Sequence, residues 1–197
     1  SYYRFDIPDY TSSNVFDYFT GTNTAKLHNV TITERSRYAV SGAALGDYSN
    51  YRYSSSWSGV SLSLTSPLGD VVAASNLGIG APDGVHLYII DGEPHFNDAP
   101  QYYDTISNKR VVGVFVANGS NPSYDLTYAY SGNPDELLGG DENNNRLLRR
   151  NDYSDDAWLH SGARLNLVSK TFTLSCKETE RGEYTLGFRA VPSIIRP

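Results

Sequence analysis

The sequence predicts an all-β, mainly antiparallel fold, a β-sandwich or jelly-roll-like domain with little helix. Three observations support this. Short apolar segments alternate with polar residues at period two, turn-forming Gly, Pro, Asn and Asp recur between them, and no segment has the 3.6-residue period of a long amphipathic helix. Tyrosine, at 16 of 197 residues, suits strands, where the ring packs while the hydroxyl reaches water.

The C-terminal segment 146–191 is the part around which we expect the chain to fold. Its last strand, 184–191, alternates Tyr, Leu, Phe and Ala with smaller or polar residues, which indicates one buried face. Gly187 within that strand indicates a bulge or a close backbone approach. Two shorter strands precede it, at 165–167 and 172–176, and the three together would close a domain.

In chain order, strand signals begin near residue 26. The clearest is a hairpin of 60–65 and 71–74, because Pro and Gly between the two runs occupy favoured turn positions. Strands are also predicted at 85–90, 111–116 and 124–130. The segment 47–58 is predicted as a loop that carries an unusual number of aromatic residues.

The predicted organisation has three parts. Residues 1–24 form an N-terminal arm or an edge strand, and 25–132 form the β-sandwich. Residues 133–197 form an Asp- and Asn-rich loop followed by the C-terminal β segment, packed with the sandwich as one compact unit. The stretch 133–156 breaks the strand pattern, so we expect either a long functional loop or a short helix at 135–138.

Charge and cysteine content narrow the classes of partner. The formal net charge of −6 argues against a nucleic-acid partner and against an anionic membrane surface, and no apolar run is long enough to span a bilayer. The single cysteine, Cys176, excludes an intramolecular disulfide and is expected to be a buried, inert thiol. The start at Ser1 fits a cleaved leader, a removed initiator Met or a boundary within a longer chain.

One resemblance covers the central part of the chain. The strand–turn–strand segment 60–75 and the hairpin 111–130 resemble those of bacterial pre-peptidase C-terminal domains, a match that extends over residues 26–132. The resemblance implies a small jelly-roll sandwich on a secreted or surface protein, of a kind that often binds calcium, collagen or sugars.

A second resemblance covers 146–191. Segments 146–150, 157–158, 162–164 and 186–191 resemble the C-terminal part of the formylglycine-generating-enzyme-like family. That family has a C-type-lectin-like fold, which also serves phage and bacterial receptor-binding proteins. The N-terminal half of the family is not visible in this sequence, and its catalytic cysteine pair cannot form from one cysteine. The resemblance therefore implies a scaffold or recognition role without oxidase activity.

Aromatic and arginine side chains are the predicted ligand contacts. Exposed rings stack on sugars or anchor peptides, and arginine supplies directional hydrogen bonds. The predicted residues are Tyr48, Tyr51, Tyr53, Trp57, Trp158 and Arg164. The alternative for Trp57 is that its ring folds back to cap the core.

Two acidic clusters are candidate calcium sites, because calcium would neutralise carboxylates that otherwise repel one another. The first comprises Asp141, Glu142, Asp152, Asp155 and Asp156, and the second comprises Asp91, Glu93 and Asp98. Nearby arginines could instead neutralise the first cluster, and the second could be a solvated turn.

No catalytic residue is assigned, because the sequence has no nucleophile elbow, phosphate-binding loop or dinucleotide fingerprint. We expect a non-enzymatic recognition module, extracellular or displayed on a bacterial surface or virion, that binds a glycan or a protein, with calcium as the candidate cofactor. Homo-oligomerisation stays open. The alternatives are a structural subunit of a virion, tail or extracellular filament, and a hydrolase with an unrecognised carboxylate pair.

Overall fold

A computed structural model describes residues 14–16, 24–26, 46–54, 56–94, 98–101, 103–117, 119–137, 140–151, 155, 157–178 and 181–189. Within these ranges the chain is antiparallel β-structure apart from one short 3-10 helix, η1 (Glu142–Asn144), which confirms the predicted fold class. Nowhere in these ranges does a helix have the length and hydrophobicity needed to cross a membrane.

The chain divides into two compact units, Ser1–Ala43 and Ala44–Pro197. In the first unit, β1 (Asn14–Phe16) pairs antiparallel with β2 (Thr24–Lys26). The second unit contains all other described strands.

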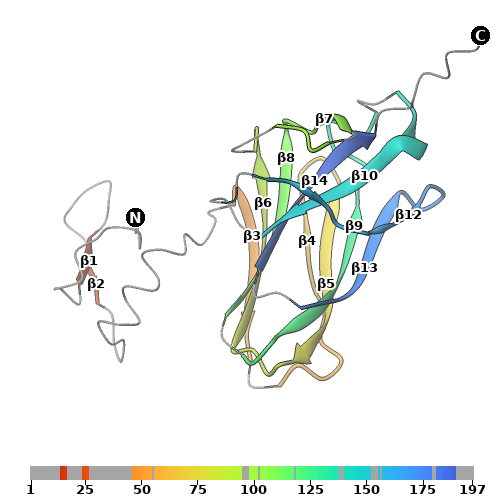
Figure 1. The fold of residues 1–197 in the computed structure, drawn as a ribbon. Helices are drawn as coiled ribbons and strands as arrows, with labels where there is room; N and C mark the ends of the chain where they lie inside the picture. The colour runs from red at the N-terminus through yellow and green to blue at the C-terminus, as the bar shows by residue number, and fades with distance from the viewer. Residues whose placement is uncertain are drawn as a thin grey trace, which may run out of the picture. The chain divides into compact units, whose positions relative to one another are not determined.

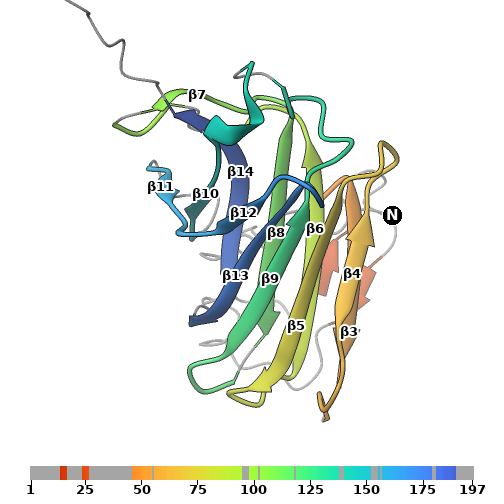
Figure 2. The same ribbon diagram turned by 90° about the vertical axis from the view of Figure 1, so that its right-hand side faces the viewer.

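The second unit is a sandwich of two sheets whose inner faces pack on each other (Figures 1 and 2). The larger sheet has the order β11 (Leu159–His160), β10 (Asn145–Arg150), β14 (Arg181–Arg189), β8 (Arg110–Ala117), β6 (Gly84–Asp91) and β3 (Tyr48–Tyr53), with β7 (Tyr103–Ile106) also paired to β14. The smaller sheet has the order β12 (Arg164–Asn166), β13 (Thr171–Glu178), β9 (Ser123–Ala129), β5 (Val71–Ile79) and β4 (Leu62–Thr65).

Strand β14 occupies the middle of the larger sheet, between β10 on one side and β8 and β7 on the other. Its Tyr184, Leu186 and Phe188 belong to the main core, as the alternation in the sequence predicts. Gly187 faces the opposite way, and a Cβ there would lie 2.5 Å from a methyl carbon of Leu148. The nearest atoms are side-chain carbons of Leu148 and Tyr103, so the close contact here is with side chains, whereas a close backbone approach was one of the two alternatives predicted.

Three segments differ from the sequence prediction. The aromatic segment 47–58 contains an edge strand, β3, instead of being only a loop. The stretch 133–156 contains η1 and β10, and residues 134–137 form turns where a helix was one alternative. Strand β7 lies where no strand was predicted. Each of these strands is paired through long-range partners, which local patterns do not reveal.

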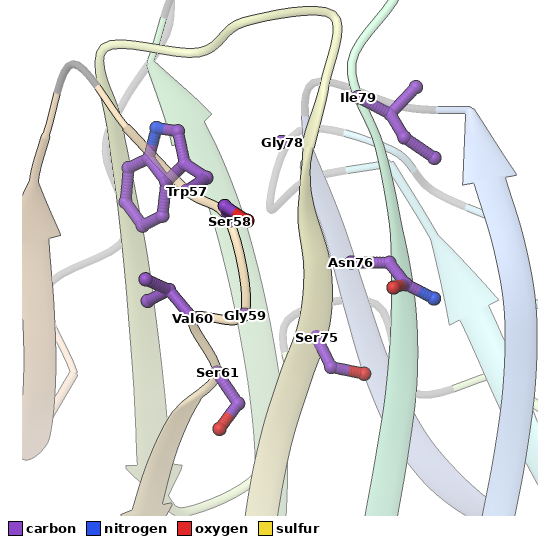
Figure 3. A pocket seen from close by; sticks show the side chains of 9 residues that line it. All are labelled: Trp57, Ser58, Gly59, Val60, Ser61, Ser75, Asn76, Gly78 and Ile79. Carbon is purple, nitrogen blue, oxygen red and sulfur yellow. The ribbon is translucent and has the colours of Figure 1, made fainter.

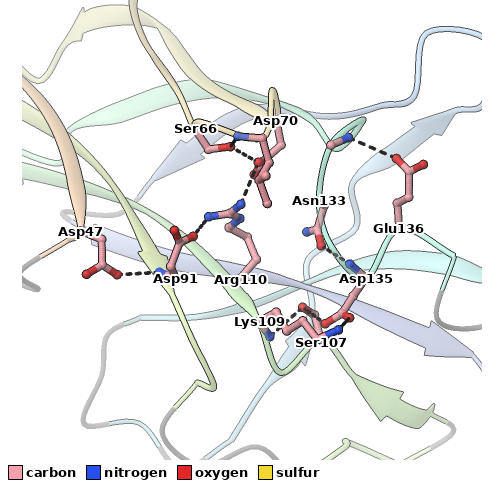
Figure 4. A network of polar contacts seen from close by, with 12 residues as sticks. Asp47, Ser66, Asp70, Asp91, Ser107, Lys109, Arg110, Asn133, Asp135 and Glu136 are labelled. Carbon is pink, nitrogen blue, oxygen red and sulfur yellow. Dashed lines mark hydrogen bonds and ion pairs between the residues drawn. The ribbon is translucent and has the colours of Figure 1, made fainter.

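A polar network joins the two sheets at one end of the sandwich (Figure 4). Arg110, at the start of β8, forms ion pairs with Asp70, 3.1 Å away in the β4–β5 hairpin, and with Asp91 at the end of β6. The hydroxyls of Ser66 and Tyr128 also donate to the Asp70 carboxylate. Arg110 and Asp70 are fully buried, so these charges stabilise the fold only as a set.

A second buried carboxylate, Asp135, extends this network (Figure 4). It accepts hydrogen bonds from the Ser107 hydroxyl at 2.8 Å and from the Asn108 amide at 3.2 Å, and it pairs with Lys109 at 3.2 Å. Asn133 donates to the Tyr128 hydroxyl at 2.8 Å and so connects the two parts. The loop after β9 is thereby fixed to the β7–β8 turn.

Candidate functional site

Two exposed tyrosine rings lie side by side on β3. Tyr51 and Tyr53 are 67% and 71% exposed, whereas Tyr48 is half-buried and packs against the core. Alternate side chains of a strand point to opposite faces, which places Tyr51 and Tyr53 together on the outer face of the larger sheet. On the inner side, Asn50 donates to the carbonyl of Ser63 at 2.7 Å and ties β3 to β4.

The neighbouring strands complete an aromatic surface, which we define as Tyr51, Tyr53, His86 and Phe115. His86 of β6 pairs with Tyr51 on one side and with Phe115 of β8 on the other, so the three form a row across the sheet. The ring of Tyr53 covers Gly84, where a Cβ would lie 2.6 Å from ring carbons. Any larger residue at Gly84 would displace that ring.

Three rings of the aromatic surface, those of Tyr51, Tyr53 and His86, meet edge to face, an arrangement favoured by their quadrupoles. Centroids of Tyr51 and Tyr53 are 6.3 Å apart with an interplanar angle of 68°, and those of Tyr51 and His86 are 6.3 Å apart at 88°. Burial lowers the pKa of His86 below its usual 6.5, so the imidazole is neutral at pH 7. The surface therefore combines uncharged rings with hydroxyl and imidazole groups.

A buried ion pair, Glu183 with Arg150, lies on the same face of the sheet as the aromatic surface. Glu183 accepts from Arg150 Nε at 2.7 Å, pairs with Arg150 Nη2 at 2.6 Å, and accepts from the Tyr88 hydroxyl at 3.0 Å. The Arg150 guanidinium in turn lies 4.4 Å from the centroid of Trp158. Four side chains from four different segments are thus locked together.

Both tryptophans are buried, which corrects the expectation that they are displayed to a ligand. Trp57 is 5% exposed and donates from Nε1 to the Pro82 carbonyl at 2.7 Å, the core-capping arrangement that was the alternative. Trp158 is 1% exposed. Indole rings reach this depth when their N–H or their face finds a partner inside the protein.

Trp57 nevertheless lies at a shallow pocket of about 380 Å³ (Figure 3). The pocket opens where the segment before β4 separates from β5, beyond the pair Leu62–Ala74. Strand β5 bulges there, because its pairing with β9 passes from Ser75–Asp125 to Ile79–Ser123, and Asn76 adopts a φ of 55°. The lining is uncharged, with Ser and Asn side chains around the indole.

Arg164, the remaining predicted ligand residue, is exposed on β12, an edge strand of the smaller sheet. The structure thus brings Tyr51 and Tyr53 together but does not bring all six predicted residues to one place. His86 and Phe115 were missed. Their period-two positions in two apolar strands indicate which face of the sheet each side chain is on. The same pattern does not indicate which strands pair, and so did not place these residues beside Tyr51.

In the first candidate calcium cluster, the described carboxylates have protein partners. Asp141 caps η1 by accepting from the Asn143 amide at 2.9 Å, and Asp155 accepts from the Asn151 amide at 2.8 Å. Glu142 bonds Lys170 at 2.8 Å, which lowers the pKa of Glu142. Asp152 and Asp156 lie outside the described residues.

In the second cluster, Asp91 is paired with Arg110, and Glu93 and Asp98 are exposed. Across the ranges that the structure describes, no three His, Cys, Asp or Glu side chains gather as metal ligands do. Calcium binding stays a prediction.

A scan against protein-family models finds no match, and searches of curated proteins and of solved structures also find none. The two family resemblances therefore stay predictions, and the fold and the surface geometry are the basis for a functional conclusion.

Proposed function

We propose that the chain is a non-enzymatic recognition module that acts outside the cell or on a cell or virion surface and binds a glycan or protein ligand through the aromatic surface. The observation that carries this proposal is the exposure of two neighbouring tyrosine rings, Tyr51 and Tyr53, on strand β3. Large amphipathic rings lose little conformational entropy on binding and dominate many interfaces.

The interactions of the buried carboxylates support a non-catalytic role. Asp70, Asp135 and Glu183 each have a cation and a hydroxyl as partners, and all three connect separate strands or turns. A carboxylate committed in this way stabilises the structure, whereas a general acid or base must reach a substrate.

Glycan- and protein-array binding before and after replacing both rings tests the proposal. Tyr51→Ala combined with Tyr53→Ala should weaken binding of the selected ligand about tenfold or more, because such rings act as hot spots. The corresponding Phe variants should retain most of the affinity, since they keep the rings. Val168→Ala, at a 98% exposed position in the β12–β13 turn, is the surface control. Full binding by a folded double-Ala protein would contradict the proposal.

The second candidate is a structural subunit of an assembly, and the edge position of β3 favours it. An edge strand presents unpaired backbone groups that a strand from another subunit can pair with. The packing of residues 1–24 on neighbours lies mostly outside the described residues. Sedimentation across a concentration series decides between a recognition module and a structural subunit. The subunit is favoured if the wild-type chain assembles, the double-Ala variant does not, and the arrays show no ligand.

A further inference from the structure

A second groove lies on the outer face of the larger sheet, at the edge opposite to β3. Its volume is about 430 Å³, within the range of small-molecule sites, and its lining includes Tyr103, Arg146, Trp158, Leu159, His160 and Arg189. These residues come from β7, β10, β11 and β14 and from the position just before β11. Strand β11 pairs with β10, and β10 and β7 both pair with β14 (Figure 2).

Strand pairing brings the two arginines together. Arg146 of β10 is opposite Gly187 of β14, and Arg189 lies two residues further along β14 on the same face. Diagonal neighbours of this kind have Cα atoms about 7–8 Å apart. Arg189 is also the cross-strand partner of Tyr103, so the hydroxyl of that tyrosine belongs to the same group.

The groove is basic although the protein is acidic. No carboxylate is among its lining residues, and within the described part of the chain neither Arg146 nor Arg189 forms an ion pair with Asp or Glu. Burial raises the pKa of Tyr103, and the positive charges of Arg146 and Arg189 partly oppose that rise. Two like charges that line one groove repel each other, and an anion bound between them would offset that repulsion.

The groove also has rigid and apolar parts. Nη1 of Arg146 donates to the carbonyls of Asn143 at 2.8 Å and Asn145 at 2.7 Å, which fixes its guanidinium at the wall. Trp158 borders the groove but is only 1% exposed, and its ring is held in place by the Arg150 guanidinium. Leu159, 63% exposed, forms an apolar wall beside it.

From these contacts we propose that the groove binds a carboxylate-bearing sugar. The carboxylate takes the charge-assisted hydrogen bonds that a guanidinium directs in its plane. The apolar face of the sugar ring packs on the exposed side chain of Leu159. The hydroxyl of Tyr103 and the imidazole of His160 serve the hydroxyl groups of the ring. This site is separate from the aromatic surface and does not depend on the function proposed there.

Titration calorimetry of the intact chain with matched probes tests this inference. Glucuronic acid should bind at least about tenfold more tightly than glucose, because hydrogen bonds to charged groups are roughly twice as strong as neutral ones. Acetate and inorganic phosphate should bind more weakly than glucuronic acid, since they lack the ring. Equal affinity for glucose and glucuronic acid would overturn the proposal, and so would tighter binding of acetate, phosphate or a glutamate-containing tripeptide. These comparisons need no variant.

Variants locate the site. Arg146→Gln or Arg189→Gln should each weaken glucuronic acid binding about tenfold. Arg164→Gln, which changes an exposed arginine on the smaller sheet, should leave it unchanged. The chain has two tryptophans, so Trp57→Phe leaves Trp158 as the single reporter, whose fluorescence should change on binding. An equal loss of affinity in Arg164→Gln would place the ligand elsewhere and refute the assignment.

Discussion

Replacing Glu183 with Gln tests whether the ion pair behind Trp158 stabilises the fold. The change keeps the shape of the side chain and an acceptor for Tyr88 but removes the counter-charge of Arg150, whose side chain is 1% exposed. Breaking a buried pair from one side typically costs about 3–5 kcal/mol. For a chain of this length that is a fall in Tm of roughly 6–20 °C.

Urea unfolding followed by tryptophan fluorescence, together with calorimetry, measures this cost. Glu136→Gln is the matched control, because Glu136 pairs at 3.6 Å with the partly exposed Lys170 and should cost at most about 1 kcal/mol. The double change Arg150→Met with Glu183→Leu should destabilise less than Glu183→Gln, since it leaves no unpaired charge. Equal costs for Glu183→Gln and Glu136→Gln would refute this reasoning.

Two further perturbations follow from contacts in the structure. Gly113→Ala should cost about 1–3 kcal/mol in denaturant unfolding, because its Cβ would lie 2.0 Å from the Tyr88 ring, whereas Gly78→Ala, with 3.5 Å to the nearest atom, should cost clearly less. The hydrogen bond from Lys170 holds the pKa of Glu142 below its usual 4.5, so this contribution to stability is present above pH 4.5 and lost as pH falls through the lower, folded pKa. Carboxyl NMR titration of Lys170→Gln should show the Glu142 pKa rising, and an unchanged value would contradict the assignment.

Period-two alternation was sufficient to predict the sandwich and most of its central strands. The hairpin of β4 and β5 follows from its apolar alternation and turn residues, and β8 from its continuous apolar run. Strand β3 was missed because its sequence, YSNYRY, has few aliphatic residues and its pairing with β6 is long-range. Strand β10 was missed because its two central leucines are flanked by arginines, whose charges hide the pattern.

The candidate sites were harder to predict, because exposure depends on tertiary contacts. Tyr51 and Trp57 are in the same aromatic segment, yet Tyr51 is exposed at a sheet edge and Trp57 is buried with its indole N–H bonded to Pro82. Nothing local separates the two residues. The basic groove was also invisible, since its two arginines meet only through the register of β10 with β14.

That register has a consequence for when the groove exists. Arg189 takes its place beside Arg146 only after the last described strand has been synthesised and has inserted between its neighbours. A nascent or partly unfolded chain lacks this pair of arginines, so a small acid that binds in the groove binds only the folded chain. At a concentration one hundred times its Kd, such a ligand would raise the free energy of unfolding by about 2.7 kcal/mol.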